Sequence, residues 1–132
     1  MKKHLLATAF AASFFVVSGA NAMTKDEYKV EKERIEAEYK VAKAKCDTLS
    51  NNAKDVCMKQ AKGAENLAKA ELEQAYKPSP GHARKVEDEK AAMRYDVAKE
   101  KCDSLKGDAK DACVSQAKAD RDRAKAHVKA KG

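Results

Sequence analysis

Two closely similar stretches decide the fold of this chain: YKVAKAKCDTLSNNAKDVCMKQAK at residues 39–62 and YDVAKEKCDSLKGDAKDACVSQAK at residues 95–118. They align without a gap at an offset of 56 residues, with 15 identities in 24 positions. Each copy contains two cysteines eleven residues apart, Cys46 and Cys57 in the first and Cys102 and Cys113 in the second. This duplication predicts two structural units of the same kind in tandem.

A helix is predicted to precede and include the first cysteine. Thr24 lies three residues before Glu27, which is the spacing of a capping box at a helix N-terminus. Apolar side chains then recur every three or four residues, with an interruption at Lys32, as on the buried side of an amphipathic helix: Tyr28, Ile35, Tyr39, Ala42, Cys46 and Leu49. We expect this helix to run from about residue 25 to about residue 48.

The helical pattern breaks between the two cysteines of each copy. Ser50, Asn51 and Asn52 favour turns and helix caps, and Gly107 with Asp108 occupies the same place in the second copy. We expect Asn52 to cap a second helix over about residues 53–76, and Asp108 to cap the last helix. The last helix is expected to fray in its second half, because the charged residues 120–123 leave little apolar surface.

The clearest boundary in the chain is KPSPG at residues 77–81, because two prolines and a glycine do not continue a helix. We therefore divide the chain into a first hairpin unit at residues 23–77, a linker at 78–82 and a second hairpin unit at 83–132.

The cysteine spacing determines the expected geometry of each unit. On one unbroken helix, residues eleven apart are about 16 Å apart along the axis, whereas a disulfide requires Cα atoms within about 7 Å. If the chain reverses at the break, Cys46 can pair with Cys57, and Cys102 with Cys113. Four cysteines permit three connectivities, and the duplication favours the two bonds within copies. We predict an all-α fold of two tandem antiparallel helical hairpins, each stapled by a disulfide, either docked as a four-helix bundle or separate.

The N-terminal 22 residues have the features of a cleaved signal peptide. Lys2 and Lys3 precede an apolar run over residues 5–17, and the segment ends in small residues at Ala20 and Ala22. We expect cleavage before Met23, export to the periplasm of a Gram-negative bacterium, and no transmembrane segment after cleavage. Four cysteines in an exported chain also favour oxidation.

The composition argues against a large hydrophobic core. Charged residues make up 37% of the chain, aromatic residues 5%, and Trp is absent, so little bulky apolar surface is available. We therefore expect no enzymatic activity. The net charge is +7, but acids and bases alternate as on solvated helix faces. The basic excess is greatest near the C-terminus, where an acidic envelope polymer is an expected alternative partner for Arg121, Arg123, Lys125, Lys129 and Lys131.

Ligand-binding and catalytic motifs give little support to other classes. The histidines after residue 22 are His82, in the predicted linker, and His127, in the predicted frayed tail. The cysteine spacing is longer than that of common zinc sites and of Cys-x-x-Cys redox motifs. We expect no cofactor, no metal and no nucleic acid partner; a metal-binding or thiol-redox protein with free cysteines is the second alternative.

Two known classes resemble this pattern. The paired disulfides resemble the twin-cysteine coiled-coil-helix proteins of the mitochondrial intermembrane space, in which disulfides hold antiparallel helices together. The exported sequence, rich in Ala, Lys, Glu and Asp, with KCD and KD-x-C elements, resembles the central helical region of the envelope protein TolA, and small exported proteins of proteobacteria are described as TolA-like on this basis. The resemblance implies a helical protein of the cell envelope.

These observations together lead to one functional expectation. The chain is expected to be a non-enzymatic periplasmic protein with a structural, stress-related or protein-interaction role. Its expected partner is an envelope protein or a second copy of the chain.

Overall fold

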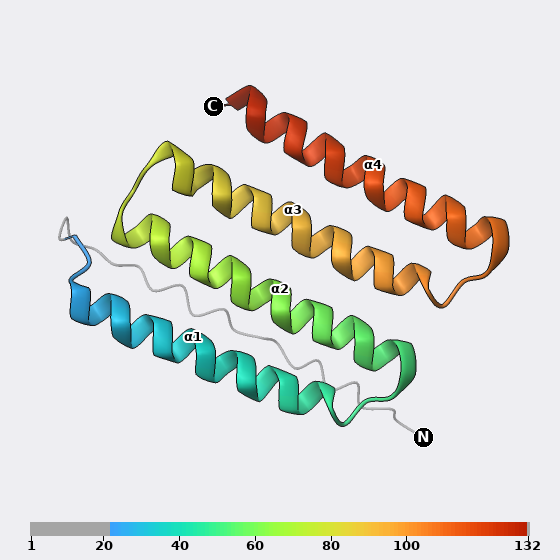
Figure 1. The fold of residues 1–132 in the computed structure, drawn as a ribbon, viewed down its shortest axis with the longest axis horizontal. Coiled ribbons are helices and arrows are strands. Elements are labelled where there is room, and N and C mark those ends of the chain that lie inside the picture. Colours follow the sequence, from blue (N-terminus) through green and yellow to red (C-terminus); the bar gives the residue numbers. More distant parts are fainter. Residues whose placement is uncertain (1–21, 132) are drawn as a thin grey trace, which may run out of the picture.

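The computed structural model describes residues 22–131 and contains four helices in antiparallel order (Figure 1). They are α1 (Lys25–Cys46), α2 (Asn51–Tyr76), α3 (Pro80–Cys102) and α4 (Gly107–Lys131). In this part of the chain, α1 packs only against α2, α2 also packs against α3, and α3 also packs against α4. The helices therefore form a single layer in chain order, and the prediction of an all-α fold of two antiparallel hairpins is confirmed. Docking of the hairpins, which the sequence left open, occurs through α2 and α3.

Each hairpin is closed at its turn by the predicted disulfide. Cys46 is bonded to Cys57 with their Cα atoms 5.4 Å apart, and Cys102 is bonded to Cys113 with a Cα separation of 5.7 Å. Both turns lie at the same end of the layer, and the connection between α2 and α3 lies at the other end (Figure 1).

The two turns repeat each other in detail. Lys54 forms an ion pair with Asp47, and Lys110 forms the equivalent ion pair with Asp103. The first residues of α2 and α4, Asn51 and Gly107, have φ angles of 55° and 58°. This left-handed conformation is accessible to Asn and Gly at low cost, so the sequence change between the copies preserves the backbone.

The first helix begins as predicted, whereas the later boundaries differ from the expectations. Thr24 and Glu27 form the capping box at the start of α1. Ser79 caps α3 by accepting a hydrogen bond from the His82 N–H, and Pro80 is the first residue of that helix, where its missing N–H is not needed. Residues 80–82, expected in the linker, therefore form the first turn of α3. The last helix was expected to fray, but α4 continues to Lys131.

The side chains buried between the helices are mostly small: Ile35, Cys46, Ala61, Ala70, Leu72, Val86, Ala91, Cys102 and Ala117. Cys46 and Cys102 are the largest side chains that are almost fully buried. Leu49 was expected on the buried side of the first helix, but it lies in the turn and is 43% exposed. With so little apolar volume, each disulfide is a central part of the core.

Helices α2 and α3 approach each other closely at Gly63. A Cβ atom built on Gly63 would lie 2.9 Å from the Cβ of Met93, which is too close for an ordinary contact. Nearer the turns, the Asn52 side-chain amide donates a hydrogen bond of 2.6 Å to the Glu100 carbonyl. Asn52 was expected to cap α2; instead Ser50 occupies the N-cap position, and Asn52 joins the two hairpins.

Removal of one disulfide is expected to destabilise the fold strongly. The Cys46→Ala/Cys57→Ala variant should lose about 3 kcal/mol of unfolding free energy, because a closed loop of this size restricts the unfolded chain. Urea unfolding followed by circular dichroism measures the loss, and Cys102→Ala/Cys113→Ala is the matched variant in the second hairpin. Peptide mass spectrometry without reductant checks the pairing, and unfolding midpoints equal to that of the oxidised parent would contradict the structural role.

Substitution of Gly63 tests the close approach of α2 and α3. Gly63→Ala should destabilise the protein by about 1 kcal/mol, because overpacking against Met93 outweighs the gain in helix propensity. In a Met93→Gly background, which removes the Met93 Cβ and Cγ atoms that the new methyl group would meet, the same substitution should instead be neutral or stabilising. A thermodynamic cycle of the four proteins measures this change of sign, and equal effects in both backgrounds would show that the two residues are not in contact.

Candidate functional site

The four cysteines occupy structural positions. Both pairs are bonded, so no free thiol is present among the described residues. Within residues 22–131, no group of three or more His, Cys, Asp or Glu side chains is arranged to hold a metal ion. In this oxidised form, the cysteines offer neither a thiolate nucleophile nor a thiolate ligand.

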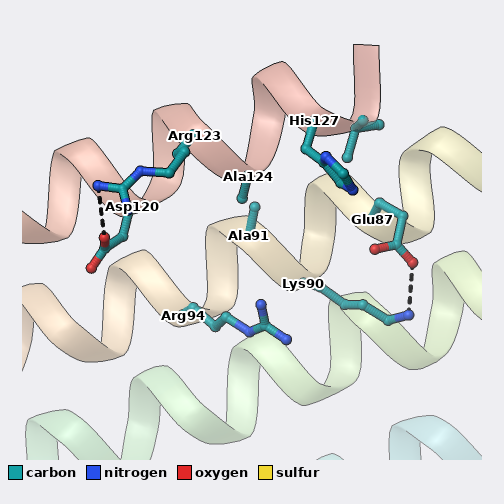
Figure 2. Close-up of a pocket in the computed structure, with 9 residues that line it drawn as sticks. Glu87, Lys90, Ala91, Arg94, Asp120, Arg123, Ala124 and His127 are labelled. Carbon is teal, nitrogen blue, oxygen red and sulfur yellow. Dashed lines mark hydrogen bonds and ion pairs between the residues drawn. The ribbon is translucent and has the colours of Figure 1, made fainter. Parts of the chain in front are cut away.

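A shallow depression of about 380 Å³ lies between α3 and α4 (Figure 2). Its polar lining includes Glu87, Lys90 and Arg94 from α3, and Asp120, Arg123 and His127 from α4. Lys90 is paired with Glu87 at 2.8 Å, and Arg123 lies 3.7 Å from Asp120. Arg94 adds a guanidinium group, so the depression has a small excess of positive charge. It can attract an anion weakly, but its surface is mostly occupied by ion pairs.

The five basic residues predicted near the C-terminus have different environments. The Arg121 guanidinium lies over the Tyr95 ring, 4.5 Å from its centroid, and is also paired with Asp122. Arg123 lines the depression described above. Lys125, Lys129 and Lys131 are exposed on α4. The two arginines therefore contribute to packing and local ion pairs, whereas the three lysines are accessible to a partner.

A buried carboxylate in α2 was not anticipated from the sequence. Glu65 is 7% exposed and receives hydrogen bonds from Lys62 at 2.8 Å and Lys69 at 2.7 Å. Burial raises the pKa of Glu65, but the two ammonium groups together lower it by a larger amount, so the pKa lies below its ordinary value. The carboxylate therefore contributes stability at neutral pH that is lost as the pH falls through this lowered pKa. The sequence signal for this buried carboxylate was a lysine three residues before it and another four residues after it. Many acidic residues in this chain have similar neighbours, so the signal did not single out Glu65.

The most exposed large apolar side chains lie on the outer side of α1. Val30 is 62% exposed and Val41 is 56% exposed. Residues eleven apart on a helix share a side, and this side is opposite to Ile35 and Cys46, which are buried against α2. The sequence contained this signal, since the two valines are out of phase with the buried residues of α1.

No other feature of the described chain identifies an activity. None of the helices within residues 22–131 has the length and apolar character needed to cross a membrane. Comparison of the chain with protein-family models, curated proteins and solved structures finds no match.

Proposed function

We propose that this chain is a non-enzymatic helical protein of the cell envelope that acts by binding a protein partner along exposed helix sides. One observation carries the proposal: Val30 and Val41 form an exposed apolar stripe on a helix that is held in place by a disulfide. A rigid helix presents such a stripe to a partner without a large loss of conformational entropy.

The compartment is part of the same proposal. Both hairpins are closed by disulfides, which form and persist in oxidising environments such as the periplasm. The predicted signal peptide agrees with export, although residues 1–21 lie outside the described part of the chain. We therefore propose the periplasm of a Gram-negative cell as its compartment.

Photo-crosslinking in cells tests the protein-binding proposal. A benzophenone amino acid at position 41 of the exported chain should give protein adducts of discrete mass, because Val41 lies in the apolar stripe. The same amino acid at position 71, exposed on α2, is the control and should give much weaker adducts. Absence of adducts at position 41, or equal labelling at both positions, would contradict the proposal.

Binding of an acidic envelope polymer is a second candidate function. It is favoured by Lys125, Lys129 and Lys131, which are exposed near the end of α4. Such binding would place several ammonium groups near anionic groups and would release counterions, so it should weaken steeply with salt.

Neutralisation of the three lysines tests this second function. Lys125→Gln/Lys129→Gln/Lys131→Gln should weaken binding to lipopolysaccharide and flatten its salt dependence by about one counterion per lost contact. Arg121 is retained, because its removal would also disturb the packing on Tyr95. Lys25→Gln/Lys40→Gln/Lys43→Gln, on α1, is the control with the same charge change. Binding that ignores salt, or that is lost equally in both variants, would argue against this candidate.

A further inference from the structure

The duplication makes the outer side of α1 equivalent to a side of α3 that is covered. Val30 corresponds to Val86 at the offset of 56 residues, and Val41 corresponds to Val97. Val86 is 9% exposed, whereas Val30 is 62% exposed. The same kind of surface is therefore covered in the second hairpin and open in the first.

The surface that covers α3 is one side of α2. Asn52 donates to the Glu100 carbonyl, the Lys59 ammonium lies 3.7 Å from the Glu100 carboxylate, and Gly63 approaches Met93. Further along, Asn66, Lys69, Ala70 and Glu73 of α2 line one depression together with His82, Lys85 and Glu89 of α3. These contacts define which sides of the two helices meet.

The equivalent side of α4 is also open. The counterparts of Asn52, Lys59, Gly63, Asn66 and Ala70 are Asp108, Ser115, Ala119, Asp122 and Ala126. All five counterparts are exposed, and they lie on α4 away from Ala117, which is buried against α3. The α4 edge of the layer thus exposes the counterpart of the α2 side that contacts α3. The α1 edge exposes the counterpart of the α3 side that contacts α2.

We infer that a second copy of this chain docks the outer side of its α4 against the outer side of α1, so that the contact between α2 and α3 is repeated between molecules. The inference rests on the proposed function and identifies its partner. In this contact, Val30 would be covered as Val86 is within the chain, and Val41 would be partly covered as Val97 is.

The side chains at the proposed contact are small at the point of closest approach. The close approach of α2 and α3 pairs Gly63 with the larger Met93. Their counterparts are Ala119 and Ala37, so one side has gained a methyl group while the other has lost most of a side chain. Two alanines permit a close but slightly wider approach of the helix backbones, because their Cβ atoms would lie 2.9 Å apart at the spacing of α2 and α3.

The charges at the proposed contact are complementary. The depression between α2 and α3 contains Asn66, Lys69 and Glu73 opposite His82, Lys85 and Glu89. The counterparts on α4 are Asp122, Lys125 and Lys129, and the counterparts on α1 are Asp26, Lys29 and Glu33. The α4 set has one excess positive charge and the α1 set one excess negative charge, which favours this pairing over contact between two α4 helices.

The proposed contact is heterologous, because it joins two different surfaces. A copy that binds through α1 keeps a free α4, and a copy that binds through α4 keeps a free α1. Such contacts build closed rings or open filaments. They also predict that two copies with different defects can complement each other.

Two half-blocked variants of the oxidised protein test the inference. Val30→Lys/Val41→Lys buries two ammonium groups in the contact and blocks α1. Ala119→Glu/Ala126→Glu adds charge and bulk to the α4 side, with residue 119 opposite Ala37 and residue 126 opposite Asp26 and Glu33, and blocks α4. By sedimentation velocity, the parent should grow in mass with concentration and each variant alone should remain a monomer. An equimolar mixture should form a species of about twice the monomer mass that does not grow further.

The controls separate the contact from general surface effects. Leu49→Lys/Leu105→Lys makes the same charge change at turn residues that are 43% and 41% exposed, and this variant should assemble as the parent does. Circular dichroism and the absence of free thiols verify that each variant is folded. Assembly of either half-blocked variant alone, or failure of the mixture to dimerise, would overturn the inference.

The outcome also distinguishes this inference from the proposed function. A parent that remains monomeric but forms adducts with another envelope protein at position 41 would overturn the self-assembly and leave the protein-binding role in place. A monomeric parent without adducts would overturn both.

Discussion

The disulfide at each hairpin turn is the constraint on which the rest of the structure depends. The helices of this chain bury few large apolar side chains, and Cys46 and Cys102 are themselves the most completely buried large residues. Because each bond fixes two helix ends about 5.5 Å apart at the Cα atoms, it sets the register of the Ala-rich contact that follows. Packing of small side chains then stabilises a geometry that the covalent links have already restricted.

The layer differs from a closed bundle in how it uses its surface. A closed bundle directs one side of every helix to a common core, whereas α2 and α3 here bury two opposite sides, and α1 and α4 bury only one. The duplication makes this asymmetry informative, since a residue such as Val86 shows how its exposed counterpart Val30 can be covered. The exposed side of α1 therefore has a structural precedent within the same molecule.

Local signals predicted much of this fold from sequence. The capping box at Thr24, the breaks between the cysteines and the cysteine spacing indicated helices, turns and pairing, because each depends on residues close in the chain. The arrangement of the hairpins could not be predicted in this way, since it depends on which side of α2 meets α3. The same reason explains why the role of Asn52 and the burial of Glu65 were missed. The start of α3 at Pro80 was not predicted, because proline interrupts a helix at interior positions but is favoured at its first position.

The position of both disulfides at one end gives the layer a mechanical polarity. Each helix is coupled only to its neighbours, so local opening spreads from helix to helix as in a linear repeat protein. The stapled end resists separation of its helices, while the end that contains Thr24, Tyr76 and Ser79 is held by non-covalent contacts alone. Amide hydrogen exchange should therefore be graded along the helices, slowest beside the cysteines and fastest at the far end. A pulling force applied there would unzip the helices toward the sulfur bridges and stop at them.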